Sequence, residues 1–116
     1  MLPAAARMRA RTEFTAAVRR GVRAAAPTLV VHLASGTHGA PQVGFIVSRA
    51  VGGAVDRNRV RRRLRHLLRD RLDRLPCGSR LVVRVNPSAS GRSSVQLAAD
   101  LDRALDRALG RQVGAR

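Results

Sequence analysis

A long amphipathic segment between two short apolar segments is the feature that most constrains the fold of this chain. From about Arg57 to Arg74 the apolar side chains recur at helical spacing and share one arc of the predicted helix. This arc is formed by Val60, Leu64, Leu67, Leu68 and Leu75. Apolar segments at 42–49 and 81–85 flank the helix. Because two strands joined by a helix can run parallel, we expect a parallel pair with this helix as the crossover.

The segment before this unit predicts a short helix and further strands. Thr12 is the expected N-cap of a helix that stops at Gly21. Residues 28–34 alternate in the manner of a strand, and we expect them to form a hairpin with 42–49. The turn-rich segment between them predicts a flexible tip. A short strand at 22–25 is also expected.

Capping signals mark the two later helices. Asp56 is the expected N-cap of the long helix, and Pro76 follows its end. Ser93 and Gln96 have the spacing of a capping box for a last helix. The apolar face of that helix comprises Leu97, Leu101, Leu105, Ala108 and Leu109. From Gly110 onward the tail is expected to fray.

Length and composition predict one small domain with an aliphatic core. A chain of 116 residues is about the size of an ordinary domain, so we expect a single domain over 1–116. Its termini, about 1–6 and 110–116, are expected to be flexible. Phe14 and Phe45 are the only aromatic residues, and the core must therefore be built from Ala, Val and Leu.

The charge balance selects for polyanionic partners. The chain carries 23 basic and 7 acidic residues, a formal net charge of +16. Every basic residue is arginine, a bias that accords with the abundance of Ala and Gly. A guanidinium group binds phosphate bidentately and stacks on bases, so nucleic acid is the favoured class of partner.

Other function classes receive little support from the sequence. The lone Cys77 has no internal disulfide partner, which favours a reduced, cytoplasmic location. The histidines are not spaced as metal ligands, and no apolar run is long enough for a membrane span. We therefore expect no metal or cofactor bound by the protein alone, and no membrane partner.

The most informative stretch is 51–66, VGGAVDRNRVRRRLRH. It joins a glycine-bearing loop to a helix start that carries many basic groups and one Asn. Free N–H groups and the positive dipole end of a helix suit RNA phosphates, and arginines there would add to this attraction. The alternative is an ordinary solvated basic face. The candidate RNA-binding residues are Arg49, Arg57, Asn58, Arg59, Arg61, Arg62 and Arg65.

This stretch resembles the RNR motif of the bacterial ribonuclease P protein family. Arg57-Asn58-Arg59 forms the motif, and Val47-Ser48-Arg49 precedes it. Phe14 stands in an E-F-x-x-x-V-R-R-G setting, and the strands around 29–33 and 43–45 follow in the family's order. The resemblance covers roughly 7–109, nearly the whole chain.

The resemblance implies a fold and a division of labour. It implies an α+β domain in the order αβββαβα, with a four-stranded sheet and a left-handed βαβ crossover, similar to the second domain of a small-subunit ribosomal protein. It also implies the protein subunit of ribonuclease P, an endoribonuclease that removes the 5′ leader of precursor tRNA. The RNA subunit would carry catalysis and the Mg²⁺ ions, so no residue of this chain is expected to be catalytic. The implied partners are ribonuclease P RNA and precursor tRNA, with no obligate protein partner.

The expected leader-binding cleft combines the first helix with one sheet face. Its candidates are Phe14, Val18, Val30, His32, Ile46 and Ser48. Phe14 and His32 are the candidates for stacking on single-stranded RNA bases. For Phe14, a packing role in the core is the equal alternative.

Three positions depart from the family pattern. Ala50 replaces a second basic residue, Gly53 replaces an Asn, and Val18 replaces a second aromatic residue. The departures predict a weaker hold on the leader, or one supplied by other arginines such as Arg19 and Arg49.

Two other classes of protein serve as alternatives to this family. A small basic ribosomal protein would share the charge and an rRNA partner, but the RNR element goes against it. A self-sufficient nuclease would need clustered carboxylates or a histidine pair. The acids instead lie beside arginines on helix faces, namely Asp70, Asp73, Asp100, Asp102 and Asp106.

Overall fold

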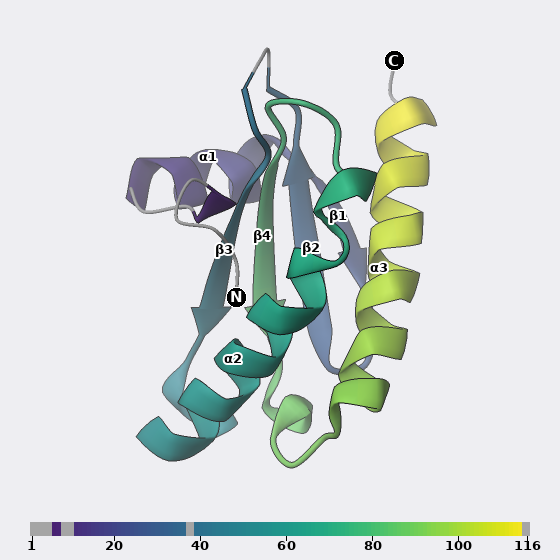
Figure 1. Cartoon of the computed structure of the whole chain (residues 1–116). Coiled ribbons are helices and arrows are strands. Elements are labelled where there is room, and N and C mark those ends of the chain that lie inside the picture. Colours follow the sequence, from purple (N-terminus) through teal and green to yellow (C-terminus); the bar gives the residue numbers. More distant parts are fainter. Residues whose placement is uncertain (1–5, 8–10, 37–38, 115–116) are drawn as a thin grey trace.

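Three α-helices and four β-strands follow the predicted order αβββαβα (Figure 1). The computed structural model describes residues 6–7, 11–36 and 39–114, except for the side chains of 11–14 and 113–114. The elements are α1 (Arg11–Arg20), β1 (Val22–Ala25), β2 (Leu29–Ala34), β3 (Gln42–Val47), α2 (Ala54–Arg69), β4 (Arg80–Val85) and α3 (Ser94–Gly114). Short 3-10 turns at Arg49–Val51, Leu72–Arg74 and Pro87–Ala89 join them.

The four strands form one mixed sheet in the order β1-β2-β4-β3. Strand β4 pairs antiparallel with β2, from Leu29 opposite Val85 to Ala34 opposite Arg80. It pairs parallel with β3, from Gln42 opposite Arg80 onward. The predicted hairpin between β2 and β3 is therefore wrong, because β4 lies between these strands. The alternation of side chains along β2 and β3 predicts which residues share a face of the sheet, but it does not predict which strand lies next to each.

The crossover from β3 to β4 through α2 is left-handed, as the resemblance implied. In Figure 1 β3 and β4 both run downward, β4 lies to the right of β3, and α2 passes in front of the sheet. Parallel crossovers are right-handed in about 98% of cases, so sequence periodicity alone would have favoured the opposite hand.

The main core lies between the sheet and the helices α2 and α3. The odd-numbered residues Leu29, Val31 and Leu33 of β2 face it. The helices contribute the buried side chains of Val60, Leu64, Leu68, Leu97, Leu101 and Leu105. The core is aliphatic, as composition predicted, and Phe45 is only half-buried at its edge.

Helix α2 begins and ends earlier than expected. It starts at Ala54 with Gly53 as N-cap, so the prediction of Asp56 as N-cap is wrong. Asp56 lies in the first turn, where a carboxylate is also favoured by the helix dipole. The helix ends at Arg69, and the predicted stretch up to Arg74 instead contains a turn and a 3-10 segment.

Helix α3 has the predicted start and a longer end. The Ser93 N–H donates to Gln96 Oε1 at 3.0 Å, and the Gln96 N–H donates to Ser93 Oγ at 3.2 Å, which confirms the capping box. The tail expected to fray from Gly110 continues as helix to Gly114, and Gln112 is buried, with its side-chain amide donating to Ser35 Oγ. At the other end of the chain, Ala6 is buried as well, against the expectation for 1–6.

Ion pairs link the end of α2 to α3. Arg71 Nε donates to Asp102 Oδ1 at 2.6 Å, and Arg74 pairs with both Asp102 and Asp106. The hydrogen bond from Arg71, more than the charges alone, holds the pKa of Asp102 below its usual value. These contacts tie the segment that follows α2 to α3.

Helix α1 lies on the opposite face of the sheet and meets β2 at Gly21. The helix starts at Arg11, so Thr12 lies inside its first turn and is not the N-cap. The Gly21 N–H donates to the Ala17 carbonyl at 2.9 Å. A Cβ atom at Gly21 would lie 2.5 Å from the Ala17 carbonyl oxygen and 2.8 Å from the Leu33 backbone. Only glycine permits this approach of helix to strand.

Alanine substitutions at two glycines should have opposite effects on stability. Gly21→Ala forces backbone apart and should lower the free energy of unfolding by about 1–3 kcal/mol. Gly110→Ala lies in an exposed part of α3, where an added Cβ meets nothing within 4 Å, and should raise it by about 0.5–1 kcal/mol. Urea denaturation of both variants measures the difference. Equal effects of the two substitutions would contradict the close approach at Gly21.

Candidate nucleic-acid interface

The predicted motif lies one turn inside helix α2 rather than at its first residue. The Arg57 N–H donates to the Gly53 carbonyl at 3.0 Å, as in an established helix. The free N–H groups of the first turn therefore belong to the residues before Arg57, and Asp56 stands among them. The free N–H groups and the arginines of the motif are thus offset by one turn of the helix, and we expect the motif itself to attract phosphate through its side chains.

The 3.6-residue repeat of α2 sorts its arginines into separate faces. The buried stripe of Val60, Leu64 and Leu68 faces the sheet. On one side of this stripe lies the β3 flank, defined as Asn58, Arg61 and Arg65 together with Arg57, which continues the line of the stripe at the start of the helix. On the other side lies the α3 flank, defined as Arg59 and Arg63. Arg62 points away from the stripe and is exposed.

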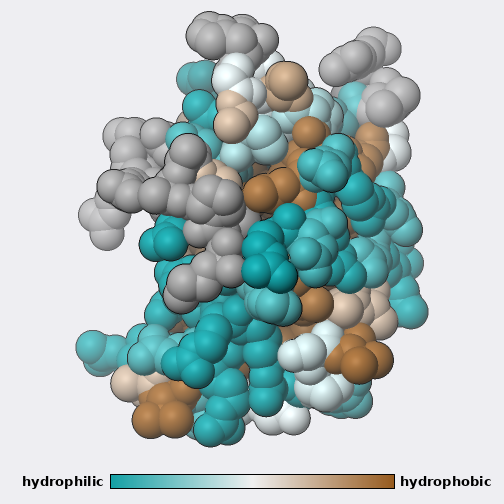
Figure 2. All heavy atoms as spheres, in the orientation of Figure 1, coloured by the Kyte–Doolittle hydropathy of each residue, from teal (hydrophilic) through white to brown (hydrophobic). Residues whose placement is uncertain are grey.

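The predicted RNA-binding residues are therefore only partly brought together. Four of the seven form the β3 flank, whereas Arg59 is exposed on the other side of the helix and Arg62 lies between the flanks. Arg49 is exposed in the 3-10 turn that leads into α2. Figure 2 shows hydrophilic side chains over the outward faces of α2 and α3.

Positive charge on the β3 flank has no acidic counterpart among the described residues. Partial burial lowers the pKa of Arg65, and the neighbouring charges of Arg7 and Arg61 lower it further. Arg61 Nη1 donates to Asn58 Oδ1 at 3.0 Å, which links these two side chains of the flank. The ion pairs of the described residues lie elsewhere, at the end of α2 and along α3. The flank is thus a cluster of like charge suited to an anionic partner.

The second predicted surface is the sheet face that α1 covers in part. Ala17 of α1 and Val82 of β4 are buried against each other. Val18, Ala34 and Ile46 pack around them and are half-buried. The rest of this face, toward the ends of β3 and β4, is not covered by α1. We call this part of the sheet the groove face, after the predicted cleft; Val18 and Ile46 lie beside it, half-buried, and Ser48 is exposed at its end.

His32 lies on this face but is buried, at 4% exposure. Neither ring nitrogen has a hydrogen-bond partner among the described residues. Burial lowers the pKa of His32, and the charges of Arg84 and Arg23 lower it further. His32 is thus a neutral ring. Because both His32 and Val30 are buried, neither side chain offers a surface on which an RNA base could stack. The side chain of Phe14, the other stacking candidate, lies outside the described residues.

Two exposed arginines on the groove face were missed by the sequence analysis. Arg23 of β1 lies directly across from His32, and Arg84 of β4 lies between Val30 and Ile46. An arginine at an alternate position of an otherwise apolar strand was the available signal in 81–85. These two exposed side chains place positive charge on the groove face, where it can contact the phosphate backbone of an RNA.

Other kinds of site find no support in the described part of the chain. Ranges 6–7, 11–36 and 39–114 contain no group of three His, Cys, Asp or Glu residues that could hold a metal ion. Among the described helices, none is both long and apolar enough to cross a bilayer.

Comparisons with known proteins agree on one family. The sequence profile of the family described as Ribonuclease P matches residues 2–109. The Ribonuclease P protein component of Streptomyces griseus is 56% identical over 113 residues, covering 90% of this chain and 92% of that protein. The corresponding protein of a Nocardioides species is 54% identical over 106 residues, covering 89% and 91%.

Solved structures show the same fold at lower identity. The RNase P protein from Thermotoga maritima superposes with a TM-score of 0.77 at 24% identity, covering 87% of this chain and 96% of that chain. A Staphylococcus aureus RNase P protein structure gives a TM-score of 0.78 at 22% identity, covering 90% and 95%.

Protonation of His32 should destabilise the free protein. Because its pKa is lowered in the folded state, the unfolded chain binds the proton first as the pH falls. Stability should therefore be lost as the pH drops through about 6.5, the ordinary value, toward the folded-state pKa. NMR titration of the ring should give a midpoint below 6.5. His32→Leu should reduce the change in melting temperature between pH 7.5 and 5.5. A midpoint above 6.5 would contradict the neutral, buried ring.

Proposed function

The chain belongs to the ribonuclease P protein family, and we propose that its two basic surfaces bind two different RNAs. As a protein component of ribonuclease P it serves tRNA processing within a ribonucleoprotein. The β3 flank of α2 binds the RNA subunit. The groove face of the sheet binds the 5′ leader of precursor tRNA. The family match goes against the ribosomal-protein alternative.

One observation supports the first assignment most strongly: the β3 flank concentrates arginines that no described acid neutralises. Partial burial lowers the pKa of Arg65, and the nearby positive charges of Arg7 and Arg61 lower it further. Phosphate groups would offset these charges and release counterions from the RNA. The flank stands on a helix packed against the core, so its spacing is rigid and suits one structured RNA.

The leader assignment is supported by the side chains and the charge of the groove face. Val18 and Ile46 supply apolar surface, whereas Arg23 and Arg84 supply charge for a backbone. An extended single strand needs both, because its bases and phosphates point in different directions. The unpartnered nitrogens of His32 lie beneath this surface and would gain a partner if the leader offered one.

We assign no chemical step to the protein. Three of its acids are engaged in structural contacts: Asp102 and Asp106 pair with Arg74, and Asp100 accepts a hydrogen bond from Thr28. Catalysis and the Mg²⁺ ions it requires would then reside with the RNA subunit. The protein would act where precursor tRNA is processed, in the cytoplasm.

Loss of two β3-flank arginines should weaken binding to the RNA subunit in a salt-dependent way. Arg61→Ala with Arg65→Ala removes two phosphate contacts and should flatten the log-log salt dependence by about two units. Asn58→Ala should lower affinity without changing the slope. Salt titrations of binding measure both quantities.

The matched control for this experiment is Arg103→Ala, an exposed arginine on α3. It should leave the slope unchanged, and circular dichroism melts should show all variants folded. Wild-type affinity and slope in the double variant would show that the flank is solvated surface only.

Loss of Arg84 should affect precursor tRNA but not mature tRNA. Arg84→Ala removes a charged contact from the groove face. We expect the free energy of precursor binding to the holoenzyme to become less favourable by about 1–2 kcal/mol. Mature tRNA lacks the leader and should bind as before. Equal losses for both tRNAs would place Arg84 against the tRNA body instead of the leader.

A further inference from the structure

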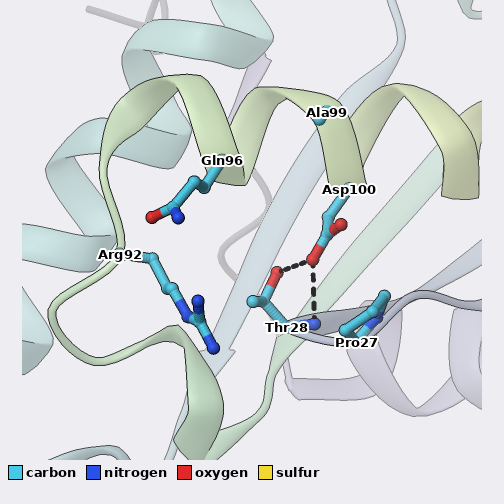
Figure 3. Close-up of a pocket in the computed structure, with 6 residues that line it drawn as sticks. All are labelled: Pro27, Thr28, Arg92, Gln96, Ala99 and Asp100. Atoms are coloured by element: carbon cyan, nitrogen blue, oxygen red, sulfur yellow. Dashed lines mark hydrogen bonds between the residues drawn. The ribbon is translucent and has the colours of Figure 1, made fainter.

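A hollow at the start of α3 lies apart from both surfaces described above. Its volume is about 270 Å³, and it is open to solvent. Figure 3 shows Arg92 and Gln96 on one side, with Thr28 and Asp100 facing them across the hollow. Pro27 and Ala99 complete the lining. The turn between β1 and β2 thus meets the first turns of α3.

Hydrogen bonds fix the wall formed by Asp100 and Thr28. Asp100 Oδ2 accepts from the Thr28 N–H at 3.0 Å and from Thr28 Oγ1 at 2.6 Å. The turn is held from its other side, because Asn86 Nδ2 and Ser88 Oγ both donate to the Pro27 carbonyl. The carboxylate therefore has a set position, with Oδ1 left over.

The opposite wall is also held in place. Gln96 Oε1 accepts the Ser93 N–H of the capping box, so the Gln96 amide nitrogen is left over. Arg92 Nε donates to the Ser88 carbonyl at 3.1 Å, and Arg63 Nη1 of α2 donates to the Arg92 carbonyl. The Nη atoms of Arg92 remain unused among the described residues.

The unused atoms around the hollow are one acceptor and two donor groups. Asp100 Oδ1 accepts, whereas Gln96 Nε2 and the Nη atoms of Arg92 donate. None of these atoms has a hydrogen-bond partner within the described ranges. The volume is below that of typical drug-sized pockets and suits a single flat group.

Guanine matches this pattern better than the other bases. Its N1–H and N2–H groups stand side by side and can both donate to the one free carboxylate oxygen, while O6 and N7 accept from amide or guanidinium groups. Adenine, cytosine and uracil place an acceptor beside each donor on that edge, and a carboxylate repels it. The guanidinium plane of Arg92 can also stack on a base.

We propose that this hollow binds one unpaired guanine base of an RNA, with Asp100 reading its N–H edge and Gln96 and Arg92 meeting its acceptors. The α3 flank, Arg59 and Arg63, leads from α2 toward the hollow, so the backbone on that side of the base would meet positive charge. The proposal depends on the function proposed above only for the source of the base.

Mononucleotides of equal charge test the base preference. The full chain is titrated with GMP and with AMP while NMR follows the backbone N–H of Thr28 and the side-chain amide of Gln96. We expect roughly tenfold tighter binding of GMP at these signals, as for a good base-edge contact. Both nucleotides carry the same phosphate, so general attraction to the basic surface cancels. Equal binding, or shifts confined to other regions, would overturn the proposal.

Two isosteric variants make the test specific. Asp100→Asn keeps an oxygen for Thr28 but replaces the free acceptor with a donor. Gln96→Glu keeps the capping oxygen but replaces the free donor with an acceptor. Both variants should fold, as melts would show, and both should lose the tenfold preference. A preference for GMP that survives in Asp100→Asn would refute the role of the carboxylate.

The reconstituted enzyme then distinguishes the sources of the base. If the RNA subunit supplies it, Asp100→Asn should weaken binding to that RNA by several-fold with an unchanged salt slope. If the leader supplies it, only precursors with a guanine in the leader should bind more weakly. If neither binding changes, the hollow does not serve an RNA of this enzyme and the proposal fails. None of these outcomes alters the salt-slope test of the β3 flank.

Discussion

Strand β4 lies between β2 and β3 and completes the hydrogen bonding of two strands that never pair with each other. Its parallel pairing with β3 requires the chain to return along the sheet, and α2 makes that return. The return places α2 across the core face with its arginines outward. It also leaves the opposite face to α1, which covers only part of it. Both proposed RNA surfaces therefore depend on the position of one central strand.

Local patterns in the sequence predicted local structure well. The stripe of Val60, Leu64 and Leu68 and the capping box at Ser93 are set by contacts within a few residues, so spacing is sufficient evidence for them. The pairing of β2 with β4 joins segments that are distant in the sequence. The alternation of apolar residues in a strand predicts which side chains share a face, but it does not predict which strand lies next to it. The start of α2 was misjudged because Asp56 suits both a cap and a first turn.

The candidate site was predictable to a similar depth. Arg61 and Arg65 were placed together because helical geometry brings residues four apart onto one face. His32 is buried on the face of the sheet against which α1 packs, and no local pattern reveals this packing. Arg84 joins the groove only because β4 is inserted beside β3. The motif resemblance supplied the topology and handedness that the pattern lacked.

The central claim is that a catalytically inert protein positions a catalytic RNA and its substrate by charge and shape. Reconstitution with the matching RNA subunit tests this claim most directly, with cleavage of precursor tRNA followed as Mg²⁺ is lowered. The account predicts no cleavage by the protein alone, and cleavage by the complex at Mg²⁺ concentrations where the RNA alone is slow, because the protein's positive charge offsets phosphate repulsion. Cleavage at the mature 5′ end by the protein without RNA would contradict it.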